Sequence, residues 1–148
     1  MAVTYYSTDD DLVKIRPNIL DLGQASWEDV HLEAFDIINR TLISRWYKVV
    51  AEEHGVDWWL TEFSADQVDV DQLLRLSCYK VLELAYMYLM KDSPESDGFE
   101  RHVTLFSKLY SQELKEVLGI GVNYDWDADD EYDTEEKYEP APRRNYRS

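Results

Sequence analysis

The chain has 148 residues, of which 45% are hydrophobic and 14% are aromatic. This length and composition suit one folded domain and exclude a chain that is disordered throughout. Acidic residues number 31 against 15 basic ones, which gives a formal net charge of −16. Such an excess argues against a protein that reads nucleic-acid sequence, because that task needs Lys and Arg to neutralise phosphates.

The single cysteine, Cys78, lies within an apolar run. One cysteine excludes an internal disulfide and supplies no metal-ligand spacing, so we interpret it as a small buried hydrophobe. No apolar run approaches the roughly 18 to 20 residues that cross a bilayer. The first eleven residues also lack the basic and apolar regions of a signal peptide. We therefore expect an intracellular, soluble product with no membrane partner.

The first helix signal is Ser7 or Thr8 followed by three aspartates at positions 9–11. A hydroxyl at the N-cap and carboxylates in the first turn both stabilise a helix start. Pro17 predicts that this helix is short and ends at about Arg16. A brief apolar connector, residues 19–22, then leads to Gly23.

A second, long helix is predicted from the segment Ser26-Trp27-Glu28-Asp29, which resembles a capping box, to Gly55. Its apolar residues recur approximately every three and four positions. Beyond it, the helical pattern is lost, and the connector carries three large aromatic rings. Their apolar area is too large to remain in water, so we expect the rings to be buried. The connector either covers the helices as a lid or forms a subunit interface, and the candidates are Trp58, Trp59 and Phe63.

A third helix is predicted from Asp69 or Asp71 to Met90, and it is apolar almost all round, which indicates a central position in the domain. After a turn at residues 92–98, a fourth helix with one apolar stripe extends from Phe99 to Gly119. So short a loop implies an antiparallel pair. The predicted fold is all-α: a small bundle of one short and three longer helices over residues 1–119, followed by an extended C-terminal arm over residues 120–148.

The arm begins with a strand-like pattern, because Ile120, Val122, Tyr124 and Trp126 alternate with small or polar residues. A lone strand does not persist in water. We therefore expect this segment to add to an edge of a neighbouring copy or of another protein.

The rest of the arm has an acidic zone at residues 129–139 and a basic tip at residues 140–148. The acidic zone is expected to stay extended and mobile when free. Prolines stiffen the tip, which carries residue types enriched at binding hot spots. The tip indicates an acidic groove on a partner, with a disordered solubilising tail as the alternative. The docking candidates of the whole arm are Val122, Tyr124, Trp126, Arg143, Arg144, Tyr146 and Arg147.

A partial metal-ligand pattern also falls in the arm, at Asp125, Asp127, Asp129 and Glu136. This is the ligand spacing of a helix-loop-helix calcium site. Asp130, however, stands where that loop needs glycine for its sharp turn, so a solvated acidic arm is the favoured interpretation.

Catalytic patterns are weak throughout the chain. The histidines, His31, His54 and His102, share no ligand spacing, and no glycine-rich loop could cradle a phosphate. Paired carboxylates carry little weight in a chain with 31 acidic residues. The sequence predicts neither an enzyme nor a bound cofactor.

The entry Tyr-Ser-Thr-x-x-Asp-Leu at residues 6–12, the order of the helices and the closing segment at residues 122–129 resemble the head-tail connector proteins of tailed bacteriophages. These are also called adaptor or head-completion proteins, and the resemblance spans about residues 5–136. Asp130 departs from it, since relatives are expected to have glycine there. The resemblance implies an all-helical virion protein at the head-tail interface, assembled in the host cytoplasm.

In that family the subunits form a ring, usually of twelve copies, docked beneath the portal. The resemblance therefore implies a homo-oligomer whose arm reaches the portal protein, while the other side receives a neck or tail-terminator protein. Double-stranded DNA would pass through the channel without sequence-specific binding. A channel lined with carboxylates repels the phosphate backbone and lets DNA slide, which agrees with the net charge.

The net charge by itself is also compatible with a second class of protein. Small acidic helical proteins can mimic DNA and occupy a nuclease or a repressor. That hypothesis accounts for the negative charge but not for the basic tip or for the alternating segment of the arm.

Overall fold

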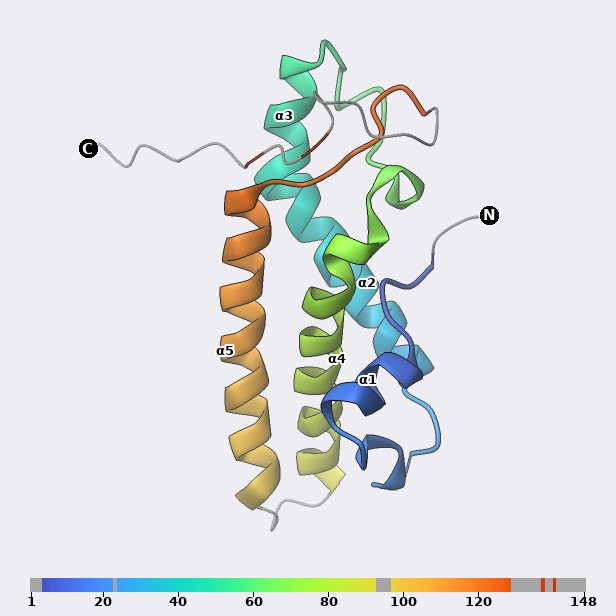
Figure 1. The fold of residues 1–148 in the computed structure, drawn as a ribbon, viewed down its shortest axis with the longest axis vertical. Helices are drawn as coiled ribbons and strands as arrows, with labels where there is room; N and C mark the ends of the chain where they lie inside the picture. The colour runs from blue at the N-terminus through green and yellow to red at the C-terminus, as the bar shows by residue number, and fades with distance from the viewer. Residues whose placement is uncertain (1–3, 23, 93–96, 129–136, 138–139, 141–148) are drawn as a thin grey trace, which may run out of the picture.

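The computed structural model describes residues 4–22, 24–92, 97–128, 137 and 140, and the fold is all-α, as predicted (Figure 1). A short helix, α1 (Asp9–Ile15), is followed by a long helical rod and then by an antiparallel pair. The rod comprises α2 (Glu28–Leu42), one π-helical turn, η2 (Ile43–Tyr47), and α3 (Lys48–Glu53); the pair comprises α4 (Val70–Asp92) and α5 (Asp97–Ile120). Two 3-10 turns, η1 (Ile19–Asp21) and η3 (Ala65–Gln67), lie in the connectors.

The start of α1 and the end of the rod follow the predicted signals, whereas the capping box predicted from Ser26 is not formed, because Trp27 is the N-cap of α2 and its side chain makes no cap hydrogen bond. At the start of α1, the Thr8 N–H donates to the Asp11 carboxylate at 2.8 Å, which satisfies a backbone donor at the N-cap. At the end of α3, Gly55 adopts a φ of +69°. There the Gly55 and Val56 N–H groups donate to the carbonyls of Glu52 and Ala51, at 3.1 and 2.9 Å. This is a Schellman cap, which explains why the rod ends at a glycine.

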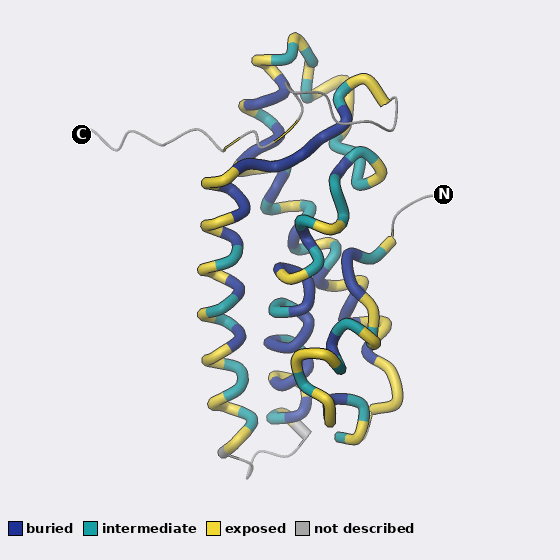
Figure 2. The backbone as a smooth tube through the Cα atoms, in the orientation of Figure 1, coloured by how far each residue is buried: buried dark blue, intermediate teal, exposed yellow. Residues whose placement is uncertain are grey.

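Helix α4 lies at the centre of the bundle, as its apolar composition predicts. It packs along α5 and is also contacted by α1 and α2. Buried positions occur around most of its circumference, whereas α5 shows one buried stripe (Figure 2). The core has two parts along this axis. One surrounds Trp46, Tyr47 and Leu114 at the α3 end, and the other surrounds Leu12, Trp27 and Phe106 near α1.

The segment that follows α5, residues 121–126, is part of this core. It turns back at Gly121, where φ is +115°, and crosses the α3 end of the bundle (Figure 1). Val122 is 0% exposed and Tyr124 is 2% exposed. The prediction that this segment must add to the edge of a partner is therefore wrong, because its own chain buries it.

The pairing that replaces a partner's edge comes from residues 67–72. Tyr124 forms an antiparallel bridge with Val68, and the Asp125 N–H donates to the Gln67 carbonyl at 2.8 Å. The Gln72 amide bonds on both sides of Val122: it accepts from the Asn123 N–H at 2.7 Å and donates to the Gly121 carbonyl at 3.3 Å. The alternating pattern did identify an extended segment, and the folded unit continues past the expected boundary at residue 119.

Candidate functional site

The α3 end of the bundle holds a cluster of aromatic rings, which we call the aromatic cluster: Trp46, Tyr47, Phe63, Tyr124 and Trp126. The π-helical turn η2 contains two of them in sequence. Trp46 is 0% and Tyr47 is 2% exposed, and both rings lie within 6 Å of the Tyr124 and Trp126 rings, centre to centre. Consecutive residues of a regular α-helix point about 100° apart. The wider π turn lets both side chains pack against the same segment.

Tyr124 anchors the C-terminal segment within this cluster. Its ring stacks on Phe63 with centres 5.6 Å apart, and its hydroxyl accepts a hydrogen bond from the Ser64 N–H at 3.0 Å. Burial raises the pKa of Tyr124 to about 12. The hydroxyl therefore stays protonated and holds the connector after α3 to the C-terminal segment.

Trp126 completes the attachment at the edge of the cluster. Its ring is stacked on His54 at 4.4 Å and on Tyr47 at 5.7 Å, with interplanar angles of 15° and 8°. The next residue, Asp127, is exposed. The chain is therefore held at Trp126, beside the end of α3.

The connector after α3 presents apolar groups to solvent at the same end of the bundle as Trp126. Trp59 is 59% and Leu60 is 74% exposed, whereas Trp58 is half-buried beneath the Lys48 ammonium, which lies 4.7 Å from its ring centre. The two tryptophan rings meet edge to face at 5.6 Å. A hollow of about 540 Å³ opens here, and we call it the aromatic hollow; its walls include Tyr47, Lys48, Trp58, Trp59, Glu62 and Phe63.

Negative charge is concentrated at the end of α3 and in the connector that follows it, and one of these carboxylates, Glu62, lines the aromatic hollow. Glu52 and Glu53 end α3, and Asp57 and Glu62 flank the exposed connector; all four are exposed. The C-terminus of a helix is the negative end of its dipole, so glutamates there add to an unfavourable field rather than offset it. This end of the molecule therefore attracts cationic groups.

The predicted site residues divide between core and surface. Phe63 packs in the aromatic cluster, Trp58 is half-buried, and Trp59 remains on the surface as an interface candidate. Val122 and Tyr124 are buried and unavailable to a partner, which corrects their assignment to a docking arm, while Trp126 is half-buried. Arg143, Arg144, Tyr146 and Arg147 lie outside the described residues.

The calcium pattern gains no support within the described part of the chain. Asp125 is 4% exposed, so it is not part of a solvated arm. No group of three or more His, Cys, Asp or Glu side chains among the described residues is placed to hold a metal ion. Asp129 and Glu136 lie outside those residues.

A polar relay that the sequence did not reveal lies near the other end of α2. Ser77 and Ser7 share a hydrogen bond of 2.7 Å, Ser7 bonds His31 Nδ1 at 2.8 Å, and His31 Nε2 bonds Asp9 at 3.1 Å. Burial lowers the pKa of His31, and the Asp9 carboxylate opposes that shift only in part, so the ring is neutral. A carboxylate only accepts, so Nε2 carries the hydrogen and the bonds run from Ser77 through Ser7 and His31 to Asp9.

This relay has the residue types of a nucleophilic triad, but its surroundings favour a structural clamp. Ser7 is 4% exposed and its hydroxyl is held between His31 and Ser77. Asp9 also accepts from the Ser26 hydroxyl at 2.8 Å and from the Trp27 N–H at 3.1 Å, at the start of α2. The relay thus ties the N-terminal segment to α2 and α4. His31 and Ser77 lie far from Ser7 and Asp9 in the sequence, so no spacing pattern predicts the relay.

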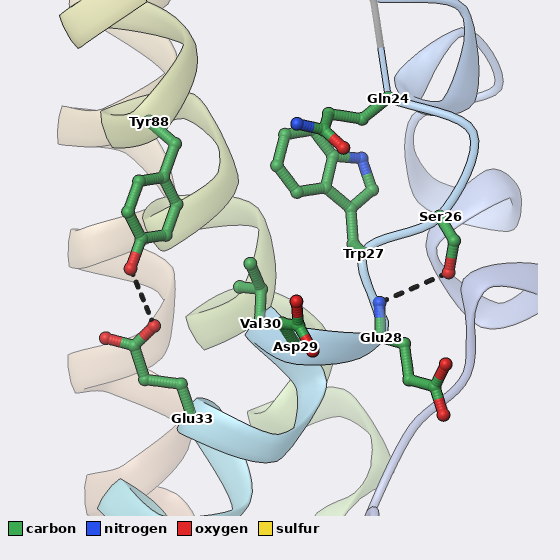
Figure 3. Close-up of a pocket in the computed structure, with 8 residues that line it drawn as sticks. All are labelled: Gln24, Ser26, Trp27, Glu28, Asp29, Val30, Glu33 and Tyr88. Carbon is green, nitrogen blue, oxygen red and sulfur yellow. Dashed lines mark hydrogen bonds between the residues drawn. The ribbon is translucent and has the colours of Figure 1, made fainter.

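A polar pocket of about 470 Å³ lies beside this clamp, between the start of α2 and the last turns of α4 (Figure 3). Three carboxylates line it, from Glu28, Asp29 and Glu33. The Tyr88 hydroxyl donates to Glu33 at 2.8 Å, and the Glu28 N–H donates to Ser26 at 3.2 Å (Figure 3). Polar groups of the pocket are therefore hydrogen-bonded to each other, and the bond between Tyr88 and Glu33 holds α2 against α4.

Comparison with protein-family models, with curated proteins and with solved structures finds no match to this chain. Within the described residues, no helix is both long enough and apolar enough to cross a membrane. The functional argument therefore depends on the residues and their geometry, together with the resemblance seen in the sequence.

Proposed function

We propose that this chain is a head-tail connector of a tailed bacteriophage, which forms a ring between the portal and the neck or tail. The observation that carries the proposal is the fixed position of Trp126. Trp126 stacks on both Tyr47 and His54, so the start of the tail is held at the end of the bundle that also carries exposed Trp59 and Leu60. A rigid helical subunit with a tail held at one end suits a ring that must reach a second ring above it.

The net charge of −16 supports the same role. Carboxylates around a channel repel the phosphates of DNA and keep the passing duplex from adhering to the wall. The basic tip, with Arg143, Arg144 and Arg147, then becomes the part of the chain that docks on the portal. The portion that docks is the tail beyond Ala128, because the core retains residues 121–126.

The test is capture by a purified portal ring, with two variants of the chain. One ends after Ala128, and the other is full length with Arg143, Arg144, Tyr146 and Arg147 replaced by Ala. We expect both variants to keep the helical content of the parent and to lose capture at least tenfold. Circular dichroism measures the helical content, and sedimentation with the portal ring measures capture.

A matched control removes positive charge from the bundle instead. Replacing exposed Arg101, Lys108 and Lys115 on α5 with Ala should leave capture unchanged. Full capture of the chain that ends at Ala128 would contradict the role of the tail. Tight inhibition of a DNA-binding enzyme by the free monomer, without any portal binding, would instead favour mimicry of DNA.

A further inference from the structure

The α3 end of the bundle carries the least covered apolar surface of the described chain. Among the large apolar side chains there, the three most exposed are Leu60 at 74%, Ile120 at 64% and Trp59 at 59%. Leu60 and Trp59 belong to the connector after α3, and Ile120 ends α5, whose last turn lies at the same end (Figures 1 and 2). Trp59 and Leu60 are adjacent in the connector, and large apolar groups exposed side by side mark an interaction surface.

The aromatic hollow in this surface has the chemistry of a groove for an extended proline-bearing peptide. Its walls are the rings of Tyr47, Trp58, Trp59 and Phe63. Grooves lined with aromatic rings bind polyproline-type segments, because these are already extended and lose little entropy on docking. The Lys48 ammonium over Trp58 also shows that a cation fits against these rings.

The charge of the same end specifies the other half of the ligand. Glu62 lines the hollow, and Glu52, Glu53 and Asp57 are exposed at or just after the C-terminus of α3, which is the negative end of its dipole. A ligand that combines prolines with arginines therefore matches both the rings and the carboxylates. An acidic peptide would be repelled.

The chain itself contains such a ligand. Its tip reads Pro-Ala-Pro-Arg-Arg-Asn-Tyr-Arg-Ser at residues 140–148. Trp126 stacks on Tyr47, which is one of the walls of the hollow, so the described chain passes close to it. Eleven residues lie between Ala128 and Pro140, and such a length spans at most about 40 Å. We infer that the tip of the free chain docks in its own aromatic hollow, with its prolines against the rings and its arginines against the carboxylates.

This contact gives the arm a closed state. A tether of this length holds the tip at a high effective concentration near the hollow, so a modest intrinsic affinity is enough. Resting on the proposed function, the portal would compete for the same tip. When the tip docks on the portal, it would leave the hollow and uncover Trp59 and Leu60. Because this happens only in subunits that have reached the ring, free subunits would associate with each other later.

The contact is tested in the full chain by a nitroxide at the tip. Ser148→Cys supplies the attachment point, while Cys78 is 2% exposed and burial raises the pKa of its thiol to about 12, which keeps it unlabelled. The measurement is the broadening of the five tryptophan indole N–H signals by the nitroxide. We expect strong broadening of Trp58 and Trp59, and none of Trp27, which packs near α1 in the other part of the core.

Two further variants decide what holds the tip. Replacing Arg143, Arg144 and Arg147 with Ala should restore the Trp58 and Trp59 signals. Replacing Arg101, Lys108 and Lys115 with Ala removes the same charge from α5 and should change nothing. Equal broadening of Trp27, Trp58 and Trp59 would overturn the inference.

Dilution separates the chain's own tip from that of another copy. Broadening that is independent of protein concentration supports the closed state, and broadening that vanishes on dilution would overturn it in favour of a neighbour's tip. Because no portal is present, failure of this experiment leaves the capture experiment unaffected, and the two proposals fail separately.

Discussion

At the scale of single residues, the tertiary contacts of His31 matter most because sequence gives no hint of them. The ring lies between Ser7 and Asp9, contacts Tyr5 edge to face at 6.5 Å, and is 3% exposed. The carboxylates of Asp9, Asp11 and Glu28 favour its protonated form, but burial outweighs them and lowers its pKa. The folded protein therefore binds a proton on His31 less readily than the unfolded chain does.

This difference predicts how stability depends on pH. The contribution of His31 is fully present above the ordinary histidine pKa of about 6.5 and is lost as pH falls through the lower pKa of the folded state. His31→Gln should therefore show a shallower loss of stability between about pH 7 and pH 5 than the parent does. Urea unfolding at a series of pH values measures this. His102→Gln is the comparison variant: burial and Arg16 also lower the pKa of His102, so this variant should flatten the slope by its own separate share.

An unchanged pH slope in His31→Gln, with the slope reduced only in His102→Gln, would contradict the role of the relay. Ser7 and Ser77 remain in place, so each variant still closes the contact between the N-terminal segment and α4.

At the scale of elements, the helices were predictable because their signals are local. Apolar residues at helical spacing, the aspartates at the start of α1 and Gly55 at the end of α3 each act within a few residues. The π turn at residues 43–47 was not predictable in this way. It depends on Trp46 and Tyr47 packing against Tyr124 and Trp126, which lie far away in sequence.

The junction between α5 and the C-terminal segment gives a prediction at this scale. Gly121 has a φ of +115°, a conformation that side-chain-bearing residues rarely adopt. Gly121→Ala should destabilise the protein by about 1 to 3 kcal/mol, because the strained turn directs Val122 into the core. Gly119→Ala is the matched control, since a Cβ at Gly119, in the last turn of α5, meets nothing within 4 Å. Thermal unfolding of the two variants measures the difference, and equal stability would show that the turn at Gly121 is not restrained.

At the scale of the whole molecule, the folded unit extends past the last helix and includes the C-terminal segment, residues 121–126. Val122 and Tyr124 are core residues, and the backbone around them is paired with residues 67–72. A chain that ends at residue 120 loses these contacts, whereas one that ends at Ala128 retains them. An experiment that removes residues 121–148 to test docking would therefore also disrupt the fold, and the two effects could not be told apart.

Truncation tests this boundary directly. The chain that ends at residue 120 should lose about 5 kcal/mol or more, since large buried side chains contribute about 2 to 5 kcal/mol each. That loss is comparable to the whole stability of a small domain, so we expect no cooperative unfolding transition. The chain that ends at Ala128 should unfold with nearly the parent's midpoint. Calorimetry distinguishes the two, and a cooperative transition in the shorter chain would contradict the assigned boundary.

The sequence by itself determined the all-α class, the order of the helices, the start of α1, the end of α3 and the extended character of residues 122–126, because each depends on local periodicity or on a local backbone preference. It also located the aromatic connector, in which Trp59 is exposed and Trp58 is half-buried. Only the tertiary structure decided which partner the extended segment finds. Tyr124 pairs with Val68 inside its own chain, and Ser7, His31 and Asp9 meet in a buried relay. The physical reason is that pairing and burial depend on residues brought together by the fold, and no spacing along the chain records which of them will meet.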